Sequence, residues 1–184
     1  MKKAKPITNE ILRNVLGIMH YQDKLITRVS VETGLRTSDV LRLRGDSITP
    51  EKPSRDNKSY IIATEQKTHK KKVSEISYNL HEDLFLWRQR KKSAPIFTWR
   101  AGRYQNSDKA IERTTYYKRL KRISKITRTD MSPHSLRKLY AQNLYARTHD
   151  IFAVQKAMNH KYITTTAGYL GIDINALIMN ALPK

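Results

Sequence analysis

The sequence predicts a mainly α fold with one small antiparallel β-hairpin, an α+β arrangement. Apolar residues recur at helical spacing between capping residues and glycines, and a single region alternates with the period of a strand. No repeat or long linker divides the chain. Its 184 residues match one typical domain, and 39% of them are hydrophobic, which is enough to build a core. We therefore expect residues 1–184 to form a single domain.

The first third of the chain carries three helix patterns. Thr8 can cap a helix whose apolar positions keep helical spacing at Ile11, Leu12, Val15, Leu16 and Met19. A second helix, from about residue 23, is expected to stop at Gly34, because glycine adopts the left-handed conformation that ends many helices. Thr37 or Ser38 can then cap a short helix over 39–43.

The middle of the chain predicts the hairpin, and the last part returns to helices. Residues 60–64 and 73–77 read as strands, and the segment EQKTHKKK, 65–72, joins them with a lysine-rich tip. Helical patterns follow at about 79–90 and 107–124. Ser132 before Pro133 marks the start of another helix. The remaining helices are expected at about 150–158, 164–169 and 173–182.

The charge of the chain points to a polyanionic partner. It has 36 Lys and Arg against 16 Asp and Glu, a formal net charge of +20. Between Arg88 and Arg128 there are 14 Lys and Arg but only two acidic residues. Each cation set against a phosphate releases condensed counterions, so a nucleic acid, DNA or RNA, is the expected partner. The alternative is a solvated basic face; a membrane surface fits less well, because no lysine-rich helix carries an exposed apolar side.

Composition also excludes several classes of site. The chain has no cysteine, which rules out disulfides, thiolate zinc sites and cysteine nucleophiles and suits a reducing compartment. Its basic start lacks the apolar core of a signal peptide, and no run approaches the roughly 20 apolar residues of a membrane span. No Asp, Glu and His cluster has metal-site spacing. We expect a soluble cytoplasmic protein, associated with the nucleoid, that needs no metal and no cofactor.

Four motifs occur in one fixed order. They are TGLRTSDVLRL at 33–43, a lysine at the hairpin tip (Lys67), SPHSLRKLYA at 132–141 and NHKYITTTAGY at 159–169. The third contains a His-x-x-Arg pair, and the fourth places a tyrosine nine residues after a histidine. Together they resemble the catalytic domain of the tyrosine recombinase (phage integrase) family, from about residue 8 to 182.

The resemblance implies a site-specific DNA recombinase that cleaves and rejoins double-stranded DNA through a 3′-phosphotyrosine intermediate. The family's functional positions fall on seven residues, with Asp39 in a supporting role and six catalytic residues: Arg36, Lys67, His134, Arg137, His160 and Tyr169. Two positions depart from the family pattern. Lys138 stands where a second histidine often follows the arginine, and Asn159 replaces the usual glycine before the histidine. Neither departure removes a catalytic group.

The chemistry of these residue types agrees with that assignment. Attack on a phosphodiester needs a nucleophile, donors for the charge on the non-bridging oxygens and a proton for the leaving 5′ oxygen. Two arginines can present forked donors to phosphate, and the helix start after Ser132 adds backbone amides. A tyrosine with an ordinary pKa of about 10 needs help with deprotonation, which a neighbouring histidine or the arginine charges can give.

Further basic residues are candidates for contacts with DNA. These are Lys70, Lys71, Lys72, Arg100, Arg103, Lys118, Arg119, Lys121 and Arg122. The expected helix 173–182 has an apolar face that must be buried, formed by Ile174, Leu177, Ile178 and Leu182. By resemblance we expect this helix to dock on a second copy of the chain, giving a homo-oligomer on DNA.

Two other functions use the same residues or the same fold. A topoisomerase IB-like enzyme would nick and reseal one strand with the same groups, and a non-catalytic DNA-binding regulator would keep only the fold. Family members commonly carry an N-terminal core-binding domain, which we do not expect within residues 1–184. The sequence is then either a complete small recombinase or a catalytic fragment.

Overall fold

The computed structural model describes residues 7–88, 94–98 and 109–173. Two helices open the chain, α1 (Asn9–Ile18) and α2 (Tyr21–Thr33), followed by the short α3 (Thr37–Val40) and a 3₁₀ turn, η1 (Gly45–Ser47). Strands β1 (Ser59–Thr64) and β2 (Lys71–Ile76) form an antiparallel hairpin. The remaining elements are α4 (Tyr78–Arg88), α5 (Arg113–Thr127), α6 (Pro133–Thr148), α7 (Ile151–Met158) and α8 (Ile163–Leu170). The predicted fold class is confirmed.

Local sequence signals explain several helix ends. The Thr8 hydroxyl accepts the N–H of Ile11, and Gly34 ends α2 with φ of 62°. Ser132 and Ser135 cap the start of α6 reciprocally, each side chain accepting the other residue's backbone N–H. That helix begins at Pro133, directly after its Ser132 cap. These signals depend on neighbouring residues alone, which is why the sequence could predict them.

Two predicted boundaries are wrong. The helix expected over 107–124 begins at Arg113, because the residues before it pair with another segment: Ala110 bridges Thr98, and the N–H of Ile111 donates to Phe97 O. The helix expected over 39–43 is α3, which begins at Thr37 with Arg36 as its N-cap. A backbone whose N–H and C=O groups already bond to another segment cannot also begin a helix. The pairing with residues 97 and 98 therefore sets the start of α5.

The hairpin lies against the helices through one face. β1 pairs with β2 from Ser59 opposite Ile76 to Thr64 opposite Lys71, and Ile48 adds an isolated bridge to Ile61. Ile61 is fully buried, whereas the cross-strand pair Ile62 and Val73 is exposed. β2 begins at Lys71, two residues earlier than expected, so the connecting loop is 65–70, while β1 ends at Thr64 as expected.

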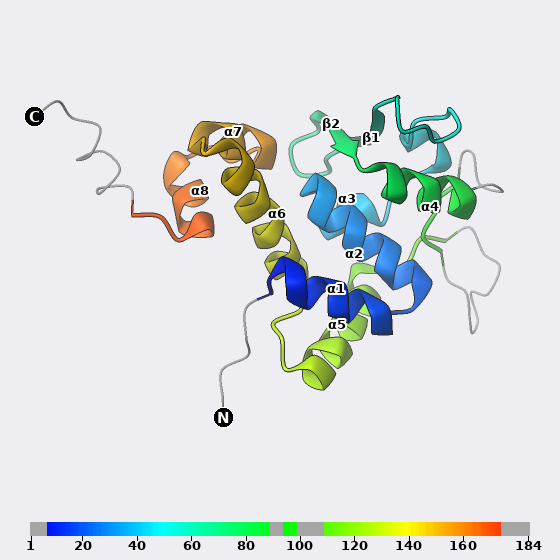
Figure 1. Ribbon diagram of the computed structural model, residues 1–184, viewed down its shortest axis with the longest axis horizontal. Coiled ribbons are helices and arrows are strands. Elements are labelled where there is room, and N and C mark those ends of the chain that lie inside the picture. The colour runs from blue at the N-terminus through cyan, green and yellow to red at the C-terminus, as the bar shows by residue number, and fades with distance from the viewer. Residues whose placement is uncertain (1–6, 89–93, 99–108, 174–184) are drawn as a thin grey trace, which may run out of the picture.

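Two hydrophobic cores stabilise the molecule. The larger core contains side chains from helices α1 through α5, from the hairpin and from the first half of α6. The smaller core consists of Ala141, Val154 and Met158, with partly buried Tyr140, Leu144, Tyr145, Tyr169 and Leu170 packed against it. Figure 1 shows α6 running between the two parts, with α7 and α8 on one side and α2 and the hairpin on the other. Helix α6 therefore belongs to both cores.

Some predictions fall outside the described residues. Arg100, Arg103 and the helix expected over 173–182, from residue 174 onward, are among them. Within the described ranges, no helix combines the length and apolar character needed to cross a membrane.

Candidate active site

Arg36 follows directly on the turn that ends α2. The left-handed Gly34 reverses the chain, Leu35 is buried, and Arg36 becomes the N-cap of α3. Its side chain is 28% exposed, and Nη1 donates to Glu65 Oε1 at 2.9 Å. One edge of the guanidinium is thus held by a carboxylate while part of the side chain remains open to solvent.

His134 and Arg137 lie one turn apart near the start of α6, but they differ in burial. Arg137 is only 7% exposed and donates to two backbone carbonyls, Gly34 O and Met158 O, the second at 2.7 Å. His134 is exposed, and its Nδ1 lies 2.9 Å from Tyr169 Oη. The same turn of α6 therefore fixes one cation within the protein and presents one imidazole at the surface.

Tyr169 lies on α8 between the two histidines. Its ring makes edge contacts with both His134 and His160, with centroids 4.8 and 5.2 Å apart. Nδ1 of His160 lies 3.0 Å from the hydroxyl of Thr166, which is fully buried. Helix α8 thus brings the candidate nucleophile, His134 and His160 into one cluster.

Burial and the arginine charges alter the acidity of this cluster. Burial raises the pKa of Tyr169 above its ordinary value, and the charges of Arg137 and Arg36 offset only part of that rise. Burial also lowers the pKa of His160, and the same two arginines lower it further. The tyrosine is therefore protonated near neutral pH, and its hydroxyl needs a proton acceptor before it can attack.

Asp39 holds the loop that carries Lys67. Asp39 is 3% exposed, and its Oδ1 accepts the backbone N–H of Gln66 at 3.1 Å. Lys67 itself is exposed and makes no hydrogen bond or ion pair within the described part of the chain. The structure thus places Lys67 next to the first motif, with a free ammonium.

A depression of about 720 Å³ lies beside Arg36 and Lys67. Its wall includes five cationic side chains: Arg36, Arg42, Lys67, Lys109 and Arg113. Arg42, Lys109 and Arg113 were not among the sequence-predicted site residues, because arginines and lysines are too common in this chain to stand out without a motif. The positive charge of this hollow complements the phosphate backbone of a nucleic acid.

The other predicted DNA contacts divide into exposed and internally bound residues. The exposed ones in the described ranges are Lys70, Lys71, Lys118, Lys121 and Arg122. Arg119 instead pairs with Asp23 at 2.9 Å. The ammonium of Lys72 donates to Ala157 O at 2.7 Å and lies 5.3 Å from the centre of the Tyr140 ring.

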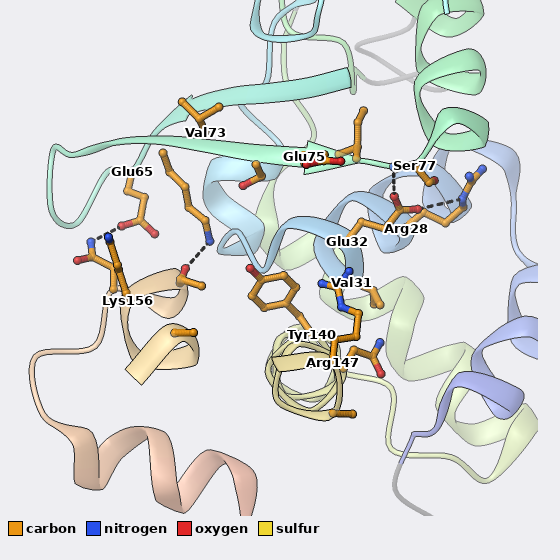
Figure 2. Close-up of a pocket in the computed structure, with 18 of the residues that line it drawn as sticks. Arg28, Val31, Glu32, Glu65, Val73, Glu75, Ser77, Tyr140, Arg147 and Lys156 are labelled. Atoms are coloured by element: carbon orange, nitrogen blue, oxygen red, sulfur yellow. Dashed lines mark hydrogen bonds and ion pairs between the residues drawn. The ribbon is translucent and has the colours of Figure 1, made fainter. Parts of the chain in front are cut away.

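A larger cavity of about 1440 Å³ lies between the hairpin, α2, α6 and the end of α7. Figure 2 shows it bounded by Val31 of α2, Val73 of β2 and Tyr140 of α6. None of the six candidate catalytic residues lines it. Across the described residues, no group of three or more acidic and histidine side chains is placed to hold a metal ion.

Sequence reasoning missed Glu65. Its carboxylate is 1% exposed and lies against Arg36, Thr68 and Asn159. The signal that could have found it is an acidic residue two positions before Lys67 in an otherwise basic loop.

Comparison with known proteins identifies the family of the chain. The sequence pattern of the phage integrase family matches residues 6–175. The probable integrase/recombinase YoeC of Bacillus subtilis is 27% identical over 154 residues, covering 83% of this chain and 78% of YoeC. The tyrosine recombinase XerA of Thermococcus kodakarensis is 24% identical over 176 residues, covering 94% of this chain and 60% of XerA.

Solved structures show the same fold. XerH site-specific recombinase bound to its difH substrate in a pre-cleavage complex superposes with a TM-score of 0.72, at 22% identity, over 98% of this chain and 54% of the XerH chain. The chain thus spans little more than half the length of some proteins that it matches. With nearly all of its residues matched by the family pattern, this chain belongs to the phage integrase family.

Proposed function

We propose that this chain is the catalytic domain of a site-specific DNA recombinase, with Tyr169 as the nucleophile. The observation that supports the proposal best is the 2.9 Å contact between Tyr169 Oη and His134 Nδ1, on the same helix end as Arg137. An imidazole nitrogen beside a phenol can accept the phenol's proton. The cationic hollow next to Arg36 offers a place for the phosphodiester.

The reaction follows from the chemistry of these groups. Tyr169 Oη attacks the phosphorus, its proton passes to His134, the Oη–P bond forms and the P–O5′ bond breaks. Arg36 and Arg137 stabilise the charge on the non-bridging oxygens. The leaving 5′ oxygen takes a proton, which the exposed ammonium of Lys67 can supply. The product is a 3′-phosphotyrosine and a free 5′ hydroxyl, so rejoining by the reverse reaction needs no ATP.

Binding and assembly are part of the same proposal. The exposed basic residues of α5, Lys118, Lys121 and Arg122, contact the DNA backbone. Copies of the chain assemble on DNA through residues 173–182, in the nucleoid. No metal or cofactor takes part, so chelation by EDTA leaves the activity unchanged.

The test is covalent capture on DNA. The probe is a pool of short nicked duplexes with a randomised central segment; adducts that survive SDS are isolated, and their DNA is sequenced to give a defined substrate. Wild-type protein should form the adduct, and Tyr169→Phe should not. Tyr162→Phe is the matched control, since Tyr162 is 58% exposed and lies just before α8.

Adduct at wild-type yield from Tyr169→Phe would overturn the assignment. Adduct formation with relaxation of plasmids but no joining of two sites would favour the topoisomerase-like alternative.

A further inference from the structure

The C-terminal end of α7 is tied to the rest of the molecule through three consecutive residues. Lys72 of β2 donates to Ala157 O at 2.7 Å, Arg137 of α6 donates to Met158 O at 2.7 Å, and Asn159 Nδ2 donates to Glu65 Oε2 at 2.8 Å. The next residue is His160. Two cations on the final carbonyls of a helix are also favoured by its dipole. The placement of His160 therefore depends on this end of α7.

Glu65 connects that helix end to both Arg36 and the Lys67 loop. Oε1 accepts from Arg36 at 2.9 Å, and Oε2 accepts from Asn159 and from the Thr68 hydroxyl, each at 2.8 Å. Its backbone closes the loop as well, since Glu65 N–H donates to Lys70 O and Glu65 O accepts from His69 N–H. Figure 2 shows Glu65 pointing from the hairpin toward the end of α7, beside Lys156. Lys67 thus lies within a loop that Glu65 organises.

The departure at Asn159 fits this arrangement. Asn159 ends α7 in the left-handed region, with φ of 55°, which asparagine tolerates better than most residues. Glycine would satisfy that backbone too, but its lack of a side chain would leave the Glu65 contact unmade. Asparagine therefore meets the conformational requirement and adds an amide donor.

The carboxylate is ionised in this setting. Burial alone would raise the pKa of Glu65, but the hydrogen bonds from Asn159 and Thr68 and the charges of Arg36 and Arg137 together lower it below its ordinary value. A buried charge is tolerated when it is paired and fully hydrogen-bonded, and both oxygens here have donors. Glu65 accordingly acts as a fixed two-oxygen acceptor between Arg36 and Asn159.

We propose that Glu65 is a positioning residue of the cleavage site, which orients Arg36 and, through Asn159, couples the Lys67 loop to the His160 turn. The inference rests on the proposed recombinase function and extends it. The carboxylate holds one edge of the Arg36 guanidinium and leaves the remaining donors for a phosphate. When a phosphate binds to Arg36, the Lys67 loop and the His160 turn are already fixed relative to each other by the Glu65–Asn159 hydrogen bond.

The first test uses Glu65→Gln, because every group that touches the carboxylate donates to it. Glutamine has a single acceptor oxygen, so its amide nitrogen must face either Arg36 or Asn159, both donors. On the captured substrate, we expect the rate of adduct formation to fall about tenfold, with the dissociation constant for DNA within about twofold of wild type. Glu75→Gln is the control: it removes the same charge from the same hairpin at an exposed residue paired with Lys58. A fall in both variants, or a faster Glu65→Gln, would overturn the proposal.

A second variant separates positioning from loss of folding. In Glu65→Gln/Asn159→Asp the amide and the carboxylate exchange places, so the net charge is kept and the hydrogen bond between positions 65 and 159 is restored with reversed polarity. Adduct formation should return to within about threefold of wild type. No recovery in a folded double variant would overturn the coupling through Asn159.

Hydrogen–deuterium exchange tests the coupling without cleavage. In Glu65→Gln, the amides of residues 66–70 and 157–161 should both exchange about tenfold faster than in wild type, while Glu75→Gln leaves both unchanged. Unchanged exchange in Glu65→Gln would overturn the inference. Faster exchange in a protein that never forms an adduct on the DNA pool would refute the proposed function and leave the coupling in place.

Discussion

The two parts of the candidate site are held by cores of very different size. Among the described residues, the larger core contains 25 buried hydrophobic side chains, and Arg36 and the start of α6 lie on it. The smaller core contains three, Ala141, Val154 and Met158, and Tyr169 packs against it on the eight-residue α8. The side proposed to bind phosphate is therefore built on extensive apolar burial, and the side of the proposed nucleophile on little.

Polar contacts between the two parts make up for part of this difference. Arg137 joins Gly34 of the larger part to Met158 of the smaller part, and Lys72 and Glu65 reach the same end of α7. Directional bonds of this kind fix geometry without burying much surface, and each can be broken by a single substitution. The position of Tyr169 relative to the arginines thus depends on a few side chains, which the following variants address.

The largest expected effect separates the two arginines. Arg137→Lys keeps the charge but replaces the two separate Nη donors to Gly34 O and Met158 O by a single nitrogen on a different stem. It should lose about 2 kcal/mol of unfolding free energy and cut cleavage by about 10³-fold. Arg36→Lys should cut cleavage by about 10²-fold, because the fork is lost, with a stability change under about 0.5 kcal/mol. Urea unfolding and adduct kinetics measure both. Equal stability losses would contradict a bridging role for Arg137.

The second variant pair compares a glycine from each part. Gly34→Ala would place a Cβ onto the Tyr140 ring at a backbone φ of 62°, so we expect a loss of about 3 kcal/mol. Gly171, at the end of α8, has φ of 72°, but among the described residues no atom beyond its chain neighbours lies within 4 Å of the position that an added Cβ would take. Gly171→Ala should therefore cost only about 1 kcal/mol of backbone strain. The shift of the urea midpoint gives both values. Similar losses of unfolding free energy in the two variants would mean that the Tyr140 ring moves away from the added Cβ at little cost.

The sequence predicts those parts of the candidate site that depend on residues close together in the chain, and misses contacts between residues that are far apart in the chain. The order of motifs predicts the position of Tyr169, and neighbouring residues predict the Gly34 turn and the Ser132 cap. The role of Glu65 depends on Arg36, 29 positions away, and on Asn159, 94 positions away. No local pattern contains that information.

The same limit applies to exposure. His134 and Arg137 share one turn of α6, yet one is exposed and the other buried, since only Arg137 faces Gly34 and Met158. The sequence makes Lys72 a candidate for contact with DNA, whereas its hydrogen bond to Ala157 O follows from packing of the hairpin against α7. The start of α5 shifted for a similar reason, because Ala110 pairs with Thr98.

The smallest expected effect concerns Lys72 at the junction of the two parts. Burial, helped by the nearby charge of Arg137, lowers the pKa of Lys72 from 10.5 to about 8. The folded pKa lies below the unfolded one, so the unfolded chain binds more protons between these values, and stability rises with pH through that window. From pH 7 to pH 9 the unfolding free energy should gain about 1 kcal/mol from this group. Lys72→Met carries no titrating amine and should lose this gain, while exposed Lys71→Met should keep it. Urea unfolding at the two pH values measures the difference, in which contributions from tyrosines cancel between variants. A gain of the same size in Lys72→Met would show that the ammonium is solvated and does not tie the hairpin to α7.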